Sequence, residues 1–276
     1  MLNFKLKILF NRIWWFIVSL KIVQFAIMKI SIITANYNNK TTLKACFDSV
    51  SNQSYSNIEH IIIDGASNDG SMDIIKIYAK LPFVKYFSAK DDGIYDALNK
   101  GIKRASGEVI GFLHADDMFA SNQTVQNIVA QFQLKQCDGV YGDLHYFKDS
   151  SPVNIIRNWV SGPFKKSLLK HGWMPPHPTL YIKSKLYQEN GLYKCNYKIA
   201  ADYDFILCLF RQKDLTFSYV PEVFVKMRMG GTSNRNVKNI ILKSLEDYRI
   251  LKNNNFKYPL ITLTLKNLTK IKQFVT

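Results

Sequence analysis

The stretch EVIGFLHADD, residues 108–117, combines an apolar run with an acidic pair. Residues 109–113 have the composition of a buried strand. The run ends at His114, and Asp116 and Asp117 follow after one alanine. Two adjacent carboxylates repel each other and are costly to bury without partners. The stretch therefore predicts a buried strand whose end leaves the core and enters a polar site.

Three more segments resemble this strand in composition, and helical patterns separate them. The strand-like segments are residues 29–34, 58–64, 84–89 and 108–113. The helical segments between them are residues 41–53, 72–81 and 93–106. This alternation predicts an α/β fold with a Rossmann-like, mostly parallel sheet, right-handed crossovers and helices on its faces.

Ligands of such sheets bind beyond the carboxyl ends of the strands. Those positions are residues 34–38, 64–70, 91–93 and 114–117, and the last three sets carry acids. A phosphate site made of protein alone uses Gly-rich loops, helix N-termini or basic side chains. The sequence has no GxGxxG after its first strand and no GxxxxGK[ST]. Dinucleotide and P-loop sites are therefore disfavoured.

Carboxylates serve a phosphate site when a cation lies between them and the phosphate. Mg²⁺ and Mn²⁺ take oxygen ligands and bridge carboxylates to a diphosphate. Asp116 and Asp117 therefore predict a divalent metal ion that holds a diphosphate. The same pair suits the cap of a helix, and the stretch alone does not decide between the two roles.

The net charge of +16 over 276 residues is unevenly distributed. No Asp or Glu precedes Asp48, and from Lys226 onward eleven Lys and Arg accompany only Glu246 and Asp247. Basic ends around a more acidic centre predict an anionic surface at the ends and a metal or base site in the middle. The hydrophobic content of 47% excludes a disordered polymer.

The amino-terminal residues 8–27 are long enough to span a bilayer, but charged residues interrupt them. Trp14 and Trp15 among lysines favour a helix that lies in the membrane interface. A helix packed on the protein, and a chain whose real start is Met28, are the alternatives.

Seven motifs together resemble those of family 2 glycosyltransferases, closest to the bacterial enzymes that make exopolysaccharide, capsule or lipopolysaccharide side chains. In order, they are SIITANYN, IIIDGASNDGS, KDDGIYDALNKGI, ASGEVIGFLHADD, MPPHPTLYIKS, AADYDFILCLF and MRMGGTS, spanning residues 29 to about 235. The resemblance implies a GT-A fold, a nucleotide-diphosphate sugar donor, a divalent metal (Mn²⁺ or Mg²⁺) and inversion at the anomeric carbon.

The resemblance also assigns site residues. Those that match the nucleotide-sugar site are Thr34, Asn36, Asp64, Asp91, Asn99, Lys100 and Asp116. Among them, Asp64 resembles the acid that contacts the base. Asp117 resembles the metal ligand of a DxD-like pair, and Asp116 resembles a ribose or metal-shell contact. His114 stands where the family often has Asn or Asp, so we do not expect it to be a ligand.

The sequence departs from the family pattern at three positions. Ala89 and Ala201 stand where relatives often carry Glu, and Leu98 stands where many carry Arg. Lys100 is a candidate to supply the missing positive charge to the diphosphate.

Inversion requires a base that takes the proton of the acceptor hydroxyl. Asp202 matches the family's catalytic acid, and we expect Asp204 to support it. The alternative is that Asp202 only caps the following helix. The other acceptor-side candidates are His177, Trp173 and Arg228.

The domain boundaries follow from these motifs. We expect a basic apolar segment at 1–27, a GT-A domain at 28–235 (nucleotide-sugar half 28–120, acceptor half 121–235) and a basic helical extension at 236–276. The expected donor is a UDP-sugar, and the expected acceptor is a saccharide or a lipid-linked saccharide. The basic ends favour a cytoplasmic protein, peripheral on the inner face of the cell membrane, and no nucleic acid is expected.

Three other readings stay open. A basic nucleic-acid-binding protein fits the net charge, but strand-end acids would repel phosphates. A nucleotidyltransferase would use a similar sheet and a similar metal. A non-catalytic relative that only binds nucleotides is compatible with Ala89 and Ala201.

Overall fold

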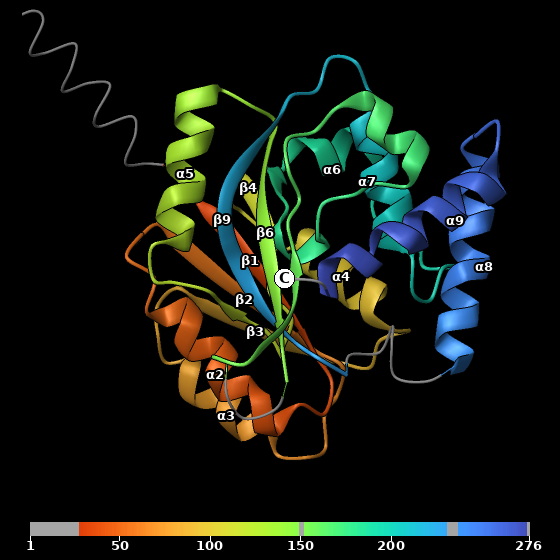
Figure 1. Ribbon diagram of the computed structural model, residues 1–276. Coiled ribbons are helices and arrows are strands. Elements are labelled where there is room, and N and C mark those ends of the chain that lie inside the picture. The colour runs from red at the N-terminus through yellow and green to blue at the C-terminus, as the bar shows by residue number, and fades with distance from the viewer. Residues whose placement is uncertain (1–27, 149–151, 231–236, 275–276) are drawn as a thin grey trace, which may run out of the picture.

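The computed structural model describes residues 28–148, 152–230 and 237–274. Its first half is the expected alternation of strands and helices (Figure 1). The strands are β1 (Ile30–Asn36), β2 (Ile58–Asp64), β3 (Val84–Ser88) and β4 (Val109–Phe112). The helices between them are α2 (Lys40–Ser51), α3 (Ser71–Tyr78) and α4 (Ile94–Ile102). All pairings in the order β3-β2-β1-β4 are parallel, as the sequence predicts.

The second half extends the same sheet with mixed strand directions. Its strands are β5 (Met118–Phe119), β6 (Gly139–Phe147), β7 (Ile155–Trp159), β8 (Tyr181–Lys183) and β9 (Phe217–Arg228). The order continues β4-β8-β6-β9-β5, with β7 paired to β6. The β6–β9 pair is parallel, whereas the β4–β8, β6–β8, β5–β9 and β6–β7 pairs are antiparallel.

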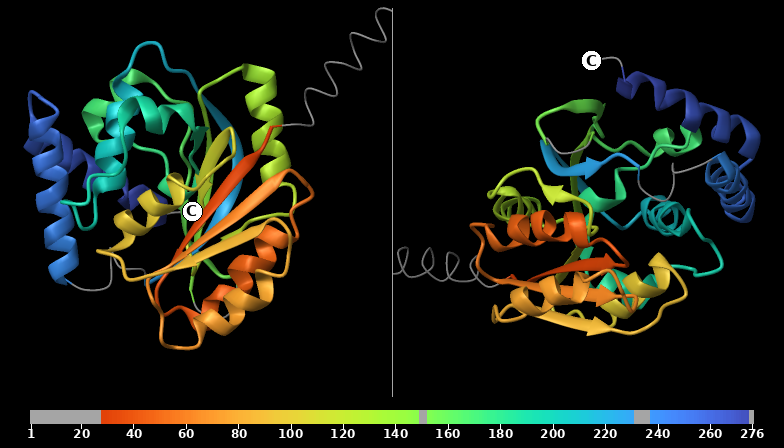
Figure 2. Two further views of the ribbon diagram at one scale, coloured as in Figure 1. Left: turned by 180° about the vertical axis from the view of Figure 1, so that it is seen from behind. Right: turned by 90° about the horizontal axis from the view of Figure 1, so that it is seen from below.

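Helices of the second half lie on both faces of the sheet and at one outer edge of the molecule. The α-helices are α5 (Thr124–Lys135), α6 (Lys185–Asn190), α7 (Ala201–Arg211), α8 (Val237–Asn253) and α9 (Pro259–Thr269). The 3₁₀ helices are η1 (Lys166–His171), η2 (His177–Thr179) and η4 (Ile271–Phe274). Figure 2 shows α8 and α9 together at the edge that lies beyond α7.

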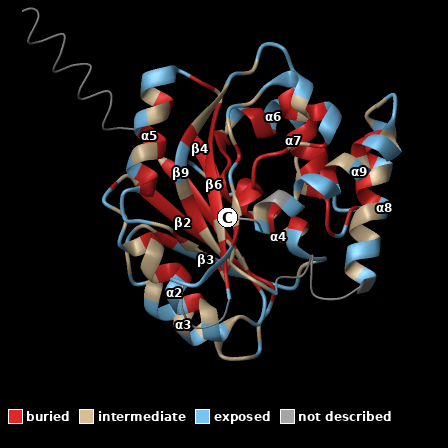
Figure 3. Cartoon of the chain, viewed as in Figure 1, coloured by how far each residue is buried: buried red, intermediate tan, exposed pale blue. Residues whose placement is uncertain are grey.

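Each face of the sheet has its own hydrophobic core. Side chains of α2, α3 and α5, such as Phe47 and Val129, cover one face. Side chains of α4, α7 and α8, such as Leu98 and Phe210, cover the other. Figure 3 shows buried residues concentrated along the central strands between these layers. Burial on both faces explains the continuous apolar runs of β1, β2 and β4 in the sequence.

One close approach in the sheet requires glycine. A Cβ atom at Gly111 in β4 would lie 2.1 Å from a ring carbon of Tyr181 in β8. Any larger residue would push β8 away from β4. Because the acidic turn follows β4 directly, this packing also helps to fix the position of the turn.

Among the described residues, no helix is both long and apolar enough to cross a membrane. The predictions made for residues 1–27 lie outside the described part of the chain.

Candidate active site

The carboxyl ends of β1, β2 and β4 lie side by side, because the three strands are parallel and adjacent. We call this row of strand ends the carboxyl edge of the sheet. Asn36 at the end of β1 is the register partner of Asp64 at the end of β2. Asn36, Asp64 and the acidic turn after β4 therefore lie at this common edge.

Asp64 is the centre of a saturated hydrogen-bond cluster, which we call the β2 edge (Asn36, Asp64, Ser67 and Ser88). Its Oδ1 accepts from Asn36 Nδ2 (2.7 Å) and Ser67 Oγ (2.5 Å). Its Oδ2 accepts from the Ser67 backbone N–H (3.0 Å) and Ser88 Oγ (2.7 Å). Burial alone would raise the pKa of Asp64, but these hydrogen bonds outweigh burial and lower it. The carboxylate is therefore held ionised by the protein itself.

The other β1 and β2 residues surround this cluster. Thr34 is fully buried, and its Oγ1 lies 2.9 Å from His60 Nε2. Thr34 therefore packs beneath the strand ends and is not exposed to a ligand. Asn36 is also buried, and its Oδ1 has no hydrogen-bond partner among the described residues. An unpaired buried acceptor is available to a ligand.

Tyr37 is a candidate that the motif comparison did not single out. It follows β1 and its side chain is 63% exposed. A Cβ atom at Gly65 would lie 3.2 Å from the Tyr37 ring and 2.6 Å from Asp91 Oδ2. Gly65 therefore lets the ring and the predicted donor residue Asp91 approach each other. The signal in the sequence was an aromatic residue directly after a strand end, where a flat ring can stack on a base.

The acidic turn forms a second group, which we call the β4 edge (His114, Asp116 and Asp117). The turn links β4 to β5 and not to a helix, so the pair is no helix cap. Asp117 is 1% exposed, and its Oδ1 accepts from the Arg228 backbone N–H of β9 (3.2 Å). Its Oδ2 is buried without a hydrogen-bond partner in the described structure. Burial and the neighbouring Asp116 raise the pKa of Asp117 well above its usual value.

His114, which we did not expect to be a ligand, lies within the candidate site. Its Nδ1 is buried and has no hydrogen-bond partner in the described part of the chain. Burial lowers the pKa of His114, although the carboxylates of Asp116 and Asp202 raise it. Its ring centroid is 6.0 Å from that of His177. His114 therefore lies within the electrostatic reach of both the acidic turn and the predicted base.

His177 supports the same region from beneath. It stacks on Phe112 of β4, with centroids 5.0 Å apart, and its Nε2 lies 2.8 Å from the Tyr193 hydroxyl. Burial lowers the pKa of His177 to about 4. The side chain is therefore neutral at pH 7 and positions its neighbours through packing and one hydrogen bond.

Asp202 occupies the first turn of α7, where a carboxylate interacts favourably with the helix dipole. Its side chain is partly exposed, and its Oδ1 lies 3.0 Å from the Tyr95 hydroxyl of α4. The same hydroxyl lies 2.7 Å from the carbonyl oxygen of Ile199. Burial, followed by the charge of Asp202, raises the pKa of Tyr95 well above its usual value, so the phenol remains protonated. The phenol and the helix start thus fix the orientation of Asp202.

Glu246 of α8 holds the loop that leads into Asp202, and the sequence analysis missed it. Its carboxylate is 3% exposed and accepts three backbone N–H groups. These belong to Lys198 (2.8 Å), Ile199 (2.9 Å) and Ala200 (3.0 Å). A buried carboxylate that satisfies three adjacent donors fixes the backbone in one conformation. The carboxyl-terminal extension is therefore part of the site's scaffold.

Asp204 does not accompany Asp202. Residues two apart on a helix point to nearly opposite sides. Asp204 is buried, pairs with Lys194 (2.8 Å) and accepts from Asn254 Nδ2 (3.1 Å). We therefore assign Asp204 to the packing of α7 against the chain around it and do not retain it at the site.

Trp173 is also engaged in packing. Its Nε1 donates to the Ser161 carbonyl (3.0 Å), and its ring stacks on Phe164 with centroids 5.2 Å apart. Phe210 and Tyr141 contact it edge-on. These partners explain the position of the ring without a sugar.

Two predicted donor residues on α4 have protein partners. Asn99 Nδ2 donates to the Tyr193 carbonyl (2.8 Å), and Asn99 Oδ1 accepts from the Tyr193 N–H (3.0 Å). Lys100 pairs with Asp96 (2.7 Å) and donates to the Lys90 carbonyl (3.1 Å). Asn99 is thus a structural clamp, and Lys100 would have to leave Asp96 to reach a diphosphate. Leu98 is fully buried in the core, so the departure from Arg belongs to packing.

Within residues 28–148, 152–230 and 237–274, no three His, Cys, Asp or Glu side chains form a preassembled metal site. Asp117 Oδ2 nevertheless fits a cation, because it is a buried carboxylate oxygen without a hydrogen-bond partner among the described residues. A bound cation would offset both the burial and the repulsion from Asp116. The remaining ligands would come from the nucleotide and from water, as Mg²⁺ sites at phosphates usually arrange.

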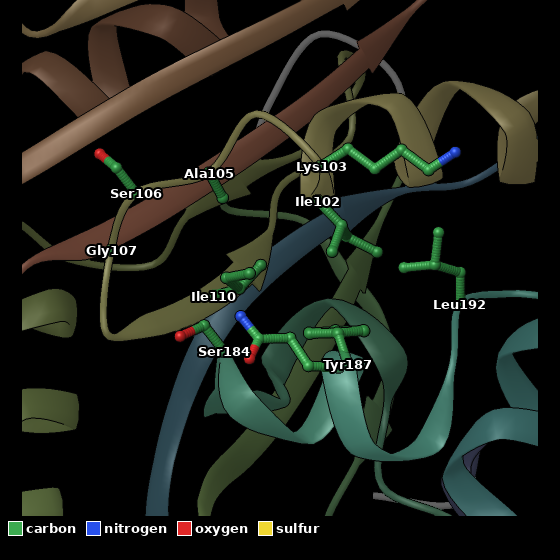
Figure 4. A pocket seen from close by; sticks show the side chains of 10 residues that line it. Ile102, Lys103, Ala105, Ser106, Gly107, Ile110, Ser184, Tyr187 and Leu192 are labelled. Carbon is green, nitrogen blue, oxygen red and sulfur yellow. The ribbon is translucent and has the colours of Figure 1, made fainter.

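A pocket of about 350 Å³ lies elsewhere, beside the amino-terminal end of β4 (Figure 4). Its lining includes Ser106, Gly107 and Ser184, on the side of the sheet away from the strand ends that carry the acids. This pocket is therefore not the site described above.

Comparisons with known proteins point in one direction. The family model of glycosyl transferase family 2 matches residues 31–204. A PGL/p-HBAD biosynthesis glycosyltransferase of Mycobacterium bovis is 30% identical over 223 residues, which are 78% of this chain and 83% of that protein. An uncharacterised glycosyltransferase of Mycobacterium tuberculosis is 35% identical over 184 residues, which are 64% and 67% of the two chains.

Solved structures share the fold at low sequence identity. S. aureus TarS 1–349 superposes with a TM-score of 0.67 and 15% identity over 88% of this chain and 72% of that one. TarS 1–349 has also been solved with UDP-GlcNAc (TM-score 0.65, 16% identity, 84% and 73% covered). The mannosyltransferase PcManGT of Pyrobaculum calidifontis, with GDP-Man and Mn²⁺, gives a TM-score of 0.61 at 15% identity over 90% and 73%.

Proposed function

Because the chain belongs to glycosyl transferase family 2, we propose that it transfers a sugar from a nucleoside-diphosphate donor to an acceptor hydroxyl with inversion at the anomeric carbon. The observation that carries this proposal is the unpartnered, buried Oδ2 of Asp117 at the end of β4. The neighbouring Asp116 makes this buried carboxyl group costly to ionise, and a donor with its cation would satisfy the oxygen.

The donor would lie along the two strand edges. Its base would approach the β2 edge, where Tyr37 offers an exposed ring and Asn36 Oδ1 an unpaired acceptor. Its diphosphate would lie near Asp116 and Asp117. A uridine diphosphate sugar is the donor we expect, and the UDP-GlcNAc complex of TarS supports that choice by fold alone.

Asp117, with Asp116 beside it, would hold a Mn²⁺ or Mg²⁺ ion. Such an ion, when bound, offsets the negative charge of the leaving diphosphate. Arg228 lies beside this site: its backbone N–H donates to Asp117, and its guanidinium lies over the Phe147 ring. We therefore retain Arg228 as a candidate phosphate contact.

Asp202 would be the general base. The acceptor oxygen forms a bond to the anomeric carbon as the bond to the diphosphate breaks, and the hydroxyl proton passes to the Asp202 carboxylate. The Tyr95 hydroxyl lies beside one oxygen of that carboxylate. The other oxygen then remains for the acceptor. Glu246 holds the preceding loop and so holds the direction of this carboxylate.

The acceptor would be a saccharide or a lipid-linked saccharide at an anionic membrane surface. The net charge of +16 supports attraction to such a surface. A lipid-linked acceptor would remain in the membrane while the protein visits it from the cytoplasmic side.

Calorimetry tests the donor site. UDP, GDP and dTDP are titrated, each with and without Mn²⁺, into the parent protein and into Asp117→Asn. We expect one nucleotide to bind, in a manner that requires both Mn²⁺ and Asp117. Asp138→Asn is the control for the same chemical change, because Asp138 is partly buried and pairs with Lys183 far from the strand ends that carry the acids.

Two results would contradict the proposal. Nucleotide binding of equal strength in Asp117→Asn would remove the metal site from the β4 edge. Release of pyrophosphate from a nucleoside triphosphate and a sugar phosphate would indicate a nucleotidyltransferase instead.

A further inference from the structure

A largely apolar surface lies on the outward side of α9 and η4, with the exposed polar residues Thr264 and Asn267 among its apolar side chains. Six large apolar side chains of this surface are each 53–64% exposed: Tyr258, Leu260, Ile261, Leu268, Ile271 and Phe274. Large apolar side chains that are gathered on one face, and not scattered singly, indicate an interaction site. The neighbouring α8 adds Ile241 and Leu245, which are also at least half exposed.

A buried ion pair sets the rotation of α9. Lys266 pairs with Asp247 of α8 (2.8 Å), and both side chains are nearly inaccessible to solvent. The Lys266 ammonium group also lies 3.1 Å from the centroid of the Tyr203 ring in α7. Because this pair needs an inward-facing Lys266, the opposite side of α9, with Leu260 and Leu268, must face outward.

Positive charge surrounds the apolar surface, and negative charge does not. Exposed basic side chains on and next to α8 are Lys238, Arg249, Lys252 and Lys257. The described residues 237–274 contain only two acids, Glu246 and Asp247, which are 3% and 1% exposed. No exposed side chain in this described segment is therefore acidic.

The segment η1 continues this charge pattern. Thr262 of α9 donates to the Lys170 carbonyl (3.0 Å), so α9 packs directly on η1. Lys165, Lys166 and Lys170 are exposed there, and residues 152–188 contain no acid at all. The same loop continues to His177 at the site. The surface thus adjoins the segment that leads to the active site.

We infer that the outward face of α8, α9, η1 and η4 docks on an anionic lipid bilayer. Apolar side chains enter the interface while lysines and arginines meet anionic headgroups, and the absence of exposed acids removes repulsion. A second copy of the chain fits less well, because a two-fold contact would place the same lysines opposite each other. A nucleic acid would leave the apolar residues without a role.

This inference rests on the membrane location in the proposed function. It adds which face of the protein contacts the bilayer and from which side the acceptor would reach the site. A lipid-linked acceptor would enter from the bilayer along η1 towards His177. Vesicle binding is measured without donor or acceptor, so a failure here leaves the transferase assignment untouched, and a failure of that assignment leaves the docking face untouched.

The test uses the full chain and two kinds of vesicle, phosphatidylcholine alone and an equal mixture of phosphatidylcholine and phosphatidylglycerol. We expect binding to the mixture only, and weaker binding as salt is raised. Leu260→Gln with Ile261→Gln lowers the partition coefficient at least about tenfold. The matched control, Ile77→Gln with Leu134→Gln, changes equally exposed residues of α3 and α5 and binds like the parent.

The contribution of charge is tested in the same way. Lys252→Gln with Lys257→Gln lowers the partition coefficient about fivefold per removed charge. Lys76→Gln with Lys135→Gln, on α3 and α5, is the matched control.

A site-resolved measurement separates this face from any other membrane-binding part of the chain. Leu260→Trp adds fluorescence that lipids brominated in their acyl chains quench, whereas Leu134→Trp adds fluorescence that they do not quench. Equal quenching of the two, or unchanged partition of the Leu260–Ile261 variant, overturns the proposal. A concentration-dependent doubling of mass that this variant abolishes would show that a second copy covers the face and would also overturn it.

Discussion

Asp64 and Asp117 occupy equivalent places in the sheet but are treated oppositely by the protein. Each follows or ends a parallel strand at the same edge, and each is at most 1% exposed. Asp64 accepts four hydrogen bonds, and its pKa is lowered. Asp117 accepts one, leaves an oxygen unpaired, and its pKa is raised.

The difference separates a carboxylate that the protein satisfies from one that leaves an oxygen for the proposed cation. Protein donors satisfy Asp64 before any nucleotide arrives, so the β2 edge is formed in advance. The β4 edge places a buried carboxyl group beside Asp116, and a bound cation would stabilise its ionised form. Carboxyl groups with strongly shifted pKa values are concentrated at functional sites, where a bound ligand can stabilise the charged form.

The largest effect on activity is expected at Asp202, whose charge acts on His114 of the β4 edge. Asp202→Asn removes the base and keeps the size of the side chain. We expect kcat to fall about 10³-fold while nucleotide affinity stays within twofold of the parent. Steady-state kinetics and calorimetry on the same sample check this. A variant that retains most of its kcat would show that Asp202 only starts helix α7.

The comparison itself is tested by a pair of matched substitutions. Asp64→Asn places an amide group where Oδ2 accepts from the Ser67 N–H, so a buried donor loses its partner. We expect a loss of about 2 kcal/mol in the free energy of unfolding.

Asp117→Asn replaces a buried carboxyl group whose Oδ2 has no hydrogen-bond partner among the described residues, and the remaining oxygen can still accept from the Arg228 N–H. Without metal, we expect its free energy of unfolding to equal or exceed that of the parent. Urea titration of both variants in the presence of a chelator measures the two changes. Changes of the same sign and size would break the distinction between the two edges.

Glu246 extends the comparison. Like Asp64, its carboxylate is fully hydrogen-bonded by protein donors, but it holds the loop that precedes Asp202. Glu246→Gln loses at least one of its three backbone hydrogen bonds. We expect kcat to fall about tenfold because the loop before Asp202 becomes less well fixed, with nucleotide affinity unchanged. Glu189→Gln, the same chemical change at an exposed position of α6, is the control. A fall in thermal stability with unaltered kcat would limit Glu246 to a structural role.

The last prediction concerns the dependence of stability on pH. Burial lowers the pKa of His60, behind the β2 edge, to about 3 and that of His177 to about 4. The unfolded chain binds protons near pH 6.5, so stability is complete above pH 6.5 and falls as pH decreases towards these lowered values. Each histidine contributes at most about 1.4 kcal/mol per pH unit.

Urea titrations between pH 7 and 5 measure this slope. His60→Gln should make it shallower, and His171→Gln, at an exposed position, should not change it. If His60→Gln leaves this slope unchanged, another group causes the loss of stability at acidic pH.

The strand ends were predictable from the sequence because local pattern determines them. The apolar run 58–64 coincides with β2 to the residue, and the acids that follow the strands lie at the common edge. The family resemblance and the GT-A fold are also confirmed. These features depend on neighbours within one strand–helix unit, which the sequence displays directly.

The rest depends on contacts between distant segments. Glu246 is separated from Ala200 by 46 residues and belongs to a helix without a motif. Asp202 and Asp204 look alike in the sequence, but the helix turns them to opposite sides. Trp173 and Asn99 carry polar groups that suit a sugar, yet Ser161 and Tyr193 satisfy them. Only tertiary packing distinguishes such residues from ligand contacts.

The Glu246 contact has a consequence for the order of events during synthesis. The ribosome makes the loop 198–200 first, and α8 follows at about 5–20 residues per second. Until α8 has emerged and folded back, the loop before Asp202 lacks the acceptor for its three N–H groups. The strands β1 to β4 can therefore assemble early, but the loop before Asp202 becomes fixed only once α8 has packed against it. The helices that complete the site also carry the proposed docking face, so transfer would start only when the chain can reach the membrane.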